Sequence, residues 1–385
     1  MSAGRLAIAL GVLSALSWLT HRYVWARLVR DAGWPAPWGR VLTVAVFTLA
    51  ALVPLAFIAV QALPRAANAP LAWIVYTWLG FALYLFLLTV LADGARLVAG
   101  LTGSLPQDPE RRLLLARAVA AAVGVGAALI GARGVVNVAR GFVVRRVRVP
   151  LAKLPRSASG YSIVQLTDIH IGPTIGRAFL EQVVAETNAL APELVVITGD
   201  LVDGTVDRLR DLVEPLRGLV ARDGVYFVTG NHEYYSGADA WIAHLRAMGV
   251  RVLRNERVPI GDVFDLAGVD DASARRMLPG HGQDVARALA GRDPSRAVVL
   301  LAHQPKALDD ASRLAVDLQL SGHTHGGQLV PFNWIARLDQ PFIAGLHRVA
   351  GTWIYVSSGT GYWGPPVRVG SQAELTRIEL VSEPY

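Results

Sequence analysis

Cysteine is absent from the 385-residue chain, and charged residues are scarce. The absence of cysteine excludes disulfides, thiolate nucleophiles, cysteine-type zinc sites and iron–sulfur clusters. Asp, Glu, Lys and Arg together make up only 17% of the residues, whereas 53% are hydrophobic. That balance indicates membrane-spanning segments. The length of the chain favours at least two domains.

Acidic residues are rare in the first part of the chain. Residues 1–150 hold 15 Lys and Arg against 4 Asp and Glu, whereas residues 151–385 hold 22 against 26. The net charge of +7 therefore comes from the apolar N-terminal part, where basic residues flank hydrophobic runs as they do at membrane surfaces. We expect membrane lipids as partners and no nucleic acid. The mildly acidic remainder suits cation binding.

Hydrophobic runs long enough to cross a bilayer are present near the N-terminus. Residues 41–63 and 71–92 each exceed 20 residues without a charge, and about 20 apolar residues span the hydrocarbon core as a helix. Residues 6–20 are uncharged but form a shorter run, which also fits the core of a signal peptide. Residues 113–132 hold one arginine near their start, where it can reach the headgroups. We predict an α-helical transmembrane bundle of about four spans over residues 1–135.

The distribution of arginines gives the expected orientation. The loops after the first and third runs carry seven arginines, whereas the opposite side carries only Arg5 and Arg65 before the last span. This favours an integral protein of the cell membrane whose C-terminal domain lies outside the cytoplasm. Residues 133–156 add seven basic residues on the side of that domain, which weakens the bias.

A basic segment, residues 136–160, follows the apolar part and alternates apolar with basic side chains. It is predicted to be a linker or an edge strand. One interpretation is a strand whose charges prevent edge-to-edge pairing. The other is a surface that rests on anionic lipid headgroups.

From residue 161 onward, short apolar runs alternate with amphipathic segments. The predicted strands cover residues 161–167, 194–198, 225–229, 297–302 and 317–320. The predicted helices cover residues 176–190, 206–221, 237–248 and 283–290. Residues 256–269 are predicted to form a hairpin. Such alternation is typical of an α/β domain, here over residues 161–385.

Each of the five predicted strands ends in side chains that bind metals. The five clusters are Asp168-Ile169-His170, Gly199-Asp200, Gly230-Asn231-His232-Glu233, His303 and Gly322-His323-Thr324-His325-Gly326. Ligand sites of open α/β sheets lie beyond the carboxyl ends of the strands, so we expect the clusters to converge on one rim. Carboxylate, imidazole and amide ligands together suit manganese, iron or zinc. Five of the nine histidines fall in these clusters, which argues against coincidence.

The five clusters resemble the motifs of the calcineurin-like metallophosphoesterases. That family has the pattern D-x-H, then G-D, G-N-H-E/D, a lone H and G-H-x-H, and all five blocks occur in this order over residues 161–328. The tail from Gly359 to Glu374 is similar to the closing segment of the membrane-associated bacterial-type branch. The resemblance implies a four-layer α/β sandwich with helices outside two central β-sheets.

The resemblance also implies a role for each residue of the clusters. One divalent metal would be bound by Asp168, His170 and His325. A second would be bound by Asn231, His303 and His323. Asp200 would bridge the two metals, and His232 would be the catalytic residue that stabilises or protonates the leaving oxygen. Two metals held in this way activate a hydroxide that attacks phosphorus.

We therefore predict a binuclear metallophosphoesterase, a hydrolase of phosphoester or pyrophosphate bonds at a membrane. Because a tethered domain acts best on substrates in the same plane, a lipid-linked phosphate is favoured. One alternative is a general phosphodiesterase or phosphatase for soluble substrates, with the spans as a passive anchor. Another is a non-catalytic membrane receptor or scaffold on the same fold, although the chain has lost none of the implied ligands.

Several residues near the clusters have more than one interpretation. Arg368 is either a phosphate contact or a salt-bridged surface arginine. Asp203 and Asp207 are expected to begin a helix. Glu233 is expected either to orient its neighbours or to cap the helix that follows it. Aromatic residues of the C-terminal third belong either to the core or to an apolar rim that takes an acyl chain or docks on the bilayer. These are Phe332, Trp334, Phe342, Trp353 and Trp363.

Overall fold

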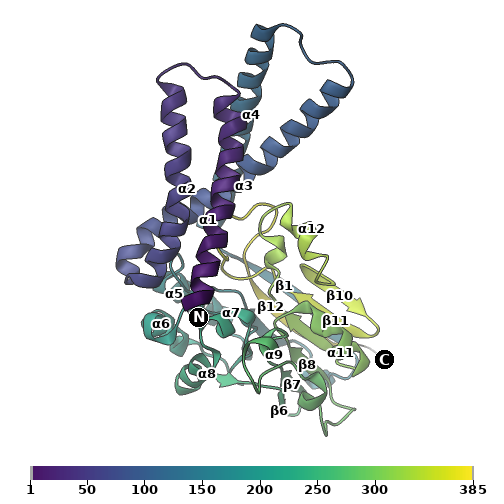
Figure 1. Ribbon diagram of the computed structural model, residues 1–385. Coiled ribbons are helices and arrows are strands. Elements are labelled where there is room, and N and C mark those ends of the chain that lie inside the picture. Colours follow the sequence, from purple (N-terminus) through teal and green to yellow (C-terminus); the bar gives the residue numbers. More distant parts are fainter. Residues whose placement is uncertain (1–2, 384–385) are drawn as a thin grey trace. The chain divides into compact units, whose positions relative to one another are not determined.

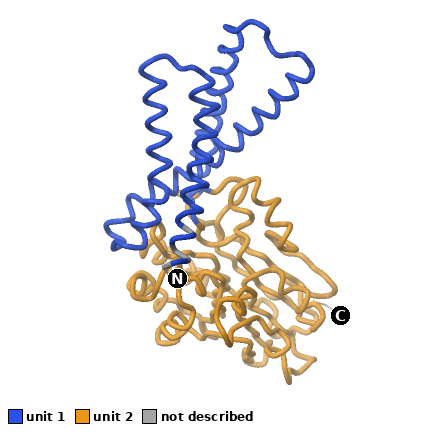
Figure 2. The backbone as a smooth tube through the Cα atoms, viewed as in Figure 1, with its two compact units in different colours: residues 1–137, 364–367 blue, residues 138–363, 368–385 orange. Residues whose placement is uncertain are grey.

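The computed structural model describes residues 3–383 and divides into two compact units (Figure 1, Figure 2). Within the described residues, unit 1 comprises residues 3–137 and 364–367, and unit 2 comprises residues 138–363 and 368–383. Unit 1 is helical, whereas unit 2 holds all the strands of the described chain.

Four helices account for most of unit 1. They are α1 (Ala3–Trp25), α2 (Trp38–Ala62), α3 (Arg65–Leu101) and α4 (Pro109–Ala139). They cover the four apolar runs identified in the sequence. Three of them, α2, α3 and α4, are long and apolar enough to cross a membrane; among the residues described, α1 does not join this set.

Close packing and one polar cluster hold the helices of unit 1 together. Gly131 of α4 lies so close to the ring of Phe81 in α3 that a Cβ atom would meet it at 2.7 Å, the kind of approach that small residues permit between membrane helices. The carboxylate of Asp93 in α3 accepts hydrogen bonds from Tyr23 Oη at 2.7 Å and Arg27 Nε at 2.8 Å. The partly buried charge of Asp93 is therefore paired with donors rather than left alone.

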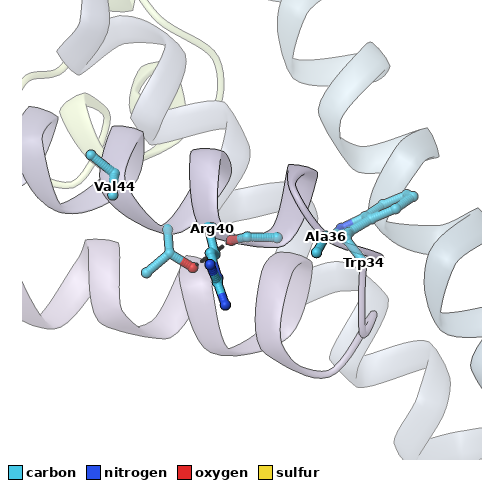
Figure 3. Close-up of a pocket in the computed structure, with 6 residues that line it drawn as sticks. Trp34, Ala36, Arg40 and Val44 are labelled. Atoms are coloured by element: carbon cyan, nitrogen blue, oxygen red, sulfur yellow. Dashed lines mark hydrogen bonds between the residues drawn. The ribbon is translucent and has the colours of Figure 1, made fainter.

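A pocket of about 540 Å³ opens beside the start of α2 (Figure 3). Its lining consists of Trp34, Ala36, Gly39, Arg40, Thr43 and Val44. Two of these lining residues are hydrogen-bonded to each other, because Thr43 Oγ1 donates to the carbonyl oxygen of Gly39 at 2.7 Å. None of the five metal-ligand clusters contributes to this pocket.

Unit 2 contains two mixed six-stranded sheets. The first has the order β1-β12-β2-β3-β4-β5, with strands Val143–Leu151, Glu374–Ser382, Tyr161–Leu166, Leu194–Ile197, Val225–Phe227 and Arg251–Val252. The second has the order β10-β11-β9-β8-β7-β6, with strands Gly345–Val349, Thr352–Val356, Leu318–Ser321, Val298–Leu301, Phe264–Gly268 and Glu256–Ile260. All five strands predicted to precede a metal-ligand cluster are present, and the predicted hairpin forms as β6 and β7.

The strands that precede the clusters are buried along their whole length or nearly so. In β2, β3, β8 and β9 every residue is buried, which explains their continuous Val, Ile and Leu runs, since parallel strands are covered on both faces. Residues of both sheets form one shared core, to which Ile163 and Val196 contribute from the first sheet and Val299 and Leu320 from the second.

Helices cover the outer face of each sheet. A second core lies between the first sheet and the helices α5 (Arg177–Ala189), α6 (Val206–Val213) and α8 (Ala238–Ala247). A third core joins the second sheet to α10 (Val285–Ala288) and α11 (Leu308–Arg313). Helix, sheet, sheet and helix therefore form the four layers that the family resemblance implied.

The basic segment forms β1, which is the edge strand of the first sheet. It pairs in parallel with β12, from Val143 opposite Glu374 to Leu151 opposite Ser382. Arg145 Nε lies 2.8 Å from a carboxylate oxygen of Glu374, which joins the two strands by an ion pair as well. A row of arginines along a sheet edge is one way in which proteins prevent further strand pairing.

The loops that carry the clusters come from both sheets. Three clusters follow β2, β3 and β4 in the first sheet, whereas His303 follows β8 and the Gly322–Gly326 loop follows β9 in the second. The loops of two facing sheets therefore supply the site together.

Candidate metal centre

The five clusters meet at one buried place in unit 2. Three groups of side chains have potential ligand atoms that all lie within 4.8 Å of one another. The groups are Asp168, His170 and His325; His170, Asp200 and His232; and Asp200, His303 and His323. Because His170 and Asp200 each belong to two groups, the three groups form one continuous constellation.

At one end of the constellation, two imidazole nitrogens face each other. His170 Nε2 lies 3.1 Å from His325 Nε2, and that nitrogen lies 3.5 Å from Asp168 Oδ1. All three side chains are buried. These nitrogen and carboxylate atoms are therefore close enough to share one metal ion, in a place where burial keeps water away.

At the other end, three acceptor atoms point toward one another. His303 Nδ1 lies 2.8 Å from the carbonyl oxygen of Thr198, which can only accept, so Nδ1 carries the proton. In a neutral ring Nε2 then presents a lone pair, and it faces Asn231 Oδ1 at 3.2 Å and Asp200 Oδ2 at 3.1 Å. Buried acceptors this close together need a positive charge between them, which either a proton on His303 Nε2 or a bound metal ion supplies. The donor set therefore fits a divalent metal.

The electrostatics of the buried histidines agree with this fit. Burial, together with the neighbouring His303, lowers the pKa of His323 to about 3, and burial lowers the pKa of His325 well below its usual value. Neutral imidazole is the form that binds metals. Burial also opposes charge on His303, but the Asp200 carboxylate outweighs it and raises the pKa of that ring. Positive charge is thus favoured where His303 and Asp200 face each other.

The backbone is strained at the same residues. Five of the seven candidate ligands have a left-handed backbone, with φ between 51° and 72°. They are Asp168, His170, Asp200, His323 and His325. Residues other than glycine adopt this region rarely and at a cost of about 1–3 kcal/mol each. Such strain persists only where the surrounding structure enforces it, and it is characteristic of functional sites.

Two glycines allow the loops to approach so closely. A Cβ atom on Gly199 would meet the backbone of Gly230 at 2.6 Å and His303 Nδ1 at 2.8 Å, and the φ of Gly199 is 89°. A Cβ atom on Gly322 would overlap the side chains of Thr167 and Asp168. The glycines within the motifs are therefore required by contacts between loops.

Glu233 joins two of the loops from behind. Its buried carboxylate accepts backbone N–H groups of Asp200 at 3.0 Å, Leu201 at 2.8 Å and Gly230 at 2.6 Å. Burial, followed by repulsion from Asp200, raises the pKa of Glu233 to about 7. The carboxyl group thus fixes the Asp200 loop to the start of α7 (Asn231–Ser236), which is the orienting role expected from the sequence.

Asp203 is a site residue that the sequence interpretation missed. Helix α6 begins only at Val206, and Asp207 lies in its first turn as expected. The carboxylate of Asp203 instead accepts from His170 Nδ1 at 3.0 Å and from His232 Nδ1 at 2.5 Å. The sequence does contain a signal for this role, because Asp203 lies only three residues after Asp200 in the loop that follows β3.

The ring of His232 lies at the edge of the constellation. Its Nε2 is 4.0 Å from Asp200 Oδ2, and its side chain is 13% exposed, more than those of His170 and His303. Burial opposes a positive charge on His232, but the carboxylates of Asp200 and Asp203 outweigh it and raise its pKa to about 9. A protonated, partly accessible imidazole is suited to proton donation.

Arg368 is buried, so its interpretation as a salt-bridged surface residue was wrong. Its guanidinium donates to the carbonyl oxygens of Gly361 at 2.7 Å, Ser358 at 2.8 Å and His325 at 3.2 Å. Burial lowers the pKa of Arg368 to about 10. The side chain ties the loop after β11 (Thr352–Val356) to the loop that carries His325.

The five aromatic residues of the C-terminal third divide between the two interpretations. Phe342 and Trp353 are partly buried and pack against hydrophobic cores. Phe332, Trp334 and Trp363 are exposed. The ring centroid of Trp363 lies 5.7 Å from that of His232 and belongs to the rim of the constellation.

Comparison with known proteins identifies the family. Residues 161–327 match the model of the calcineurin-like phosphoesterases. An uncharacterized metallophosphoesterase of Campylobacter jejuni is 34% identical over 301 residues, which cover 77% of this chain and 78% of that protein. The chain belongs to the calcineurin-like phosphoesterase family.

Two vertebrate relatives are more similar in sequence, and both are named transmembrane protein with metallophosphoesterase domain. The Danio rerio protein is 45% identical over 264 residues, 66% of this chain, and the Bos taurus protein is 44% identical over 291 residues, 72% of this chain. The matched regions span 60% and 65% of those two proteins. A solved Danio rerio dimetal phosphatase aligns with 58% of this chain and 93% of its own at 14% identity and a TM-score of 0.36, which carries no conclusion.

Replacing Asp203 tests its role as the residue that positions two histidines. Asp203→Asn removes the charge that holds His170 and His232, and partners of metal-binding histidines typically contribute about 10–100-fold to metal affinity or activity. We expect losses of that size in the rate of phosphoester hydrolysis and in the affinity for added metal, measured by titration. Asp207→Asn changes an exposed carboxylate in the next helix and should leave both unchanged. Equal behaviour of the two variants would contradict the role.

Proposed function

We propose that the chain is a metal-dependent hydrolase of phosphoester or pyrophosphate bonds that acts at a membrane. The observation that carries this proposal is the buried constellation in which His303 Nε2 lies 3.2 Å from Asn231 Oδ1 and 3.1 Å from Asp200 Oδ2. Membership of the calcineurin-like phosphoesterases supports the reaction class. The three helices that are long and apolar enough to cross a membrane support the location.

We assign the ligands to two divalent metals, which would be manganese, iron or zinc. The first would be held by Asp168, His170 and His325. The second would be held by Asn231, His303 and His323. Asp200 would serve both, which agrees with its place between the groups at the two ends of the constellation. When bound, a metal pair of this kind lowers the pKa of a water molecule and neutralises charge on phosphoryl oxygens.

We assign to His232 the protonation of the leaving oxygen. Asp203 holds its Nδ1 at 2.5 Å, which leaves Nε2 free to face a substrate. Its partial exposure lets a bound phosphoester reach that nitrogen, whereas the candidate ligand His303 is fully enclosed. Asp203 also binds Nδ1 of His170, at 3.0 Å. One carboxylate therefore orients both a candidate metal ligand, His170, and the candidate acid, His232.

A lipid-linked phosphate is the substrate class that we favour. The rings of Tyr235 and Trp363 lie 5.1 Å and 5.7 Å from that of His232, and both side chains are mostly exposed. Two aromatic walls beside the candidate acid suit a substrate whose leaving group is apolar or planar. A phospholipid or a nucleotide-activated glycolipid precursor has such a group and lies in the plane of a membrane.

Replacing Asp200 tests the metal assignment. We expect the wild-type chain to bind at least two equivalents of metal and Asp200→Asn to bind fewer, measured by elemental analysis. Hydrolysis should fall by about 100-fold or more, since metal stabilisation of the transition state amounts to several kcal/mol and 1.4 kcal/mol corresponds to a factor of ten. Asp262→Asn, an exposed carboxylate in the β6–β7 turn, is the control. Full activity of Asp200→Asn would refute the assignment.

The substrate preference is tested with the full chain in lipid nanodiscs. We expect kcat/KM for a lipid-linked phosphodiester to exceed that for bis(p-nitrophenyl) phosphate by about tenfold or more, which corresponds to about 1.4 kcal/mol of additional binding in the transition state. Equal values for both substrates would favour a general phosphodiesterase with a passive anchor. No hydrolysis of either substrate by a metal-loaded chain would favour a non-catalytic receptor or scaffold.

We further propose that unit 2 lies outside the cytoplasm, as the distribution of arginines in the loops favours. The cysteine-free chain permits a direct test with single cysteines at the exposed positions Val220 in unit 2 and Leu101 at the end of α3. These positions are separated by α4. A membrane-impermeant maleimide added to intact cells should label Val220→Cys and spare Leu101→Cys. The reverse pattern would place unit 2 in the cytoplasm.

A further inference from the structure

The short helix α12 (Phe332–Ala336) belongs to unit 2 and is labelled in Figure 1. Large apolar side chains on this helix and just beyond it are exposed to solvent. Phe332 is 43% exposed, Trp334 66%, Ile335 56% and Leu338, two residues beyond the helix, 88%. We call these four residues the α12 patch. Large apolar side chains scattered singly over a surface are ordinary, but several on one turn of chain indicate a binding surface.

The α12 patch is held in place by its neighbours. A Cβ atom on Gly327 would overlap the backbone of Asn333, so α12 packs directly on the loop that carries His325. Beyond the patch, Gln340 is buried, and its Oε1 accepts the backbone N–H of Lys306 at 3.1 Å. Both ends of the segment are anchored, so the apolar side chains are displayed by a folded element rather than by a loose loop.

We propose that the α12 patch inserts into the interfacial region of the lipid bilayer that holds this chain. This proposal goes beyond hydrolysis and requires only that the chain is anchored in a membrane. Lipid is favoured over a protein partner by two features, the short link between α4 and β1 and the residue types of the patch.

The connection between the units keeps unit 2 near the membrane. Helix α4, which is long and apolar enough to cross a bilayer, ends at Ala139, and β1 begins at Val143. An extended chain covers at most about 3.6 Å per residue, so this link spans no more than about 14 Å. A surface of unit 2 is therefore held within reach of the headgroup region, where exposed apolar side chains can leave water.

The composition of the α12 patch suits a bilayer interface. Arg337, which is exposed, comes three residues after Trp334 in the chain, and Leu338 follows directly. Tryptophan is enriched at the boundary between headgroups and hydrocarbon, and arginine can bind lipid phosphates there while leucine enters the acyl region. A surface for a soluble protein partner would have no need of this combination next to a membrane anchor.

Insertion at this place would bring the candidate metal centre to lipid substrates. Gln328 follows the loop of His325, and its side-chain amide binds Trp363 twice, by donation to the Trp363 carbonyl oxygen at 2.7 Å and by acceptance of its N–H at 3.0 Å. The ring of Trp363 in turn lies beside His232. The segment that carries the α12 patch is thus joined through the buried side chain of Gln328 to the loop that carries Trp363 at the rim of the constellation.

Single cysteines in the cysteine-free, full-length chain test the proposal. Leu338→Cys and the control Val220→Cys, an exposed apolar position elsewhere in unit 2 at 69%, are labelled with the fluorophore NBD. Each chain is reconstituted singly in nanodiscs of phosphatidylcholine and phosphatidylglycerol. We expect NBD at Leu338 to emit at shorter wavelength, to be quenched by lipids with a doxyl group high on the acyl chain, and to resist aqueous iodide. NBD at Val220 should show the opposite pattern.

Two outcomes would overturn the proposal. NBD at Leu338 that is quenched by iodide as strongly as NBD at Val220 would show that the α12 patch stays in water. Protection from iodide without quenching by doxyl lipids would show that protein covers the patch.

A kinetic comparison tests whether the α12 patch matters for lipid substrates. Leu338→Asp should slow hydrolysis of a lipid-linked phosphodiester in nanodiscs and leave hydrolysis of bis(p-nitrophenyl) phosphate unchanged, with Val220→Asp as control. The NBD fluorescence measurements test membrane insertion whether or not the chain proves to be a hydrolase.

Discussion

The structure of unit 2 depends on bringing electron-rich atoms together where water is excluded. His303 Nε2 lies 3.2 Å from Asn231 Oδ1 and 3.1 Å from Asp200 Oδ2, an arrangement that is unfavourable unless a proton or a metal ion supplies positive charge. Five of the seven candidate ligands also have a left-handed backbone. Interactions elsewhere must offset these costs, and the buried carboxylate of Glu233, with its three backbone donors, is one of them.

The two sheets explain how such distant segments meet. Parallel, fully buried strands end at nearly the same level, so the loops after β2, β3 and β4 lie next to one another by construction. The shared core brings the ends of β8 and β9 up to them from the second sheet. Buried polar residues then join the loops, with Asp203 holding two histidines and Arg368 binding three carbonyl groups.

The rim of the constellation differs in character from its interior. The interior consists of charged and polar atoms, whereas the aromatic rings of Tyr235 and Trp363 lie beside His232 at its edge. Buried ligands for cations beside an apolar rim support our proposal of a phosphorylated substrate with an apolar portion. The three helices of unit 1 that are long and apolar enough to cross a membrane support the same proposal.

The apolar helices, the strands of unit 2 and the five clusters could be predicted from the sequence, because each depends on a local pattern: an uncharged run, a buried strand, or ligand residues where that strand ends. Other features emerge only from the folded chain. Loops from two sheets share the site, Asp203 binds His170 and His232 instead of starting a helix, Arg368 is buried, and α12 is exposed. These features depend on residues far apart in the chain, and no local pattern contains the distances that the packing of two sheets creates.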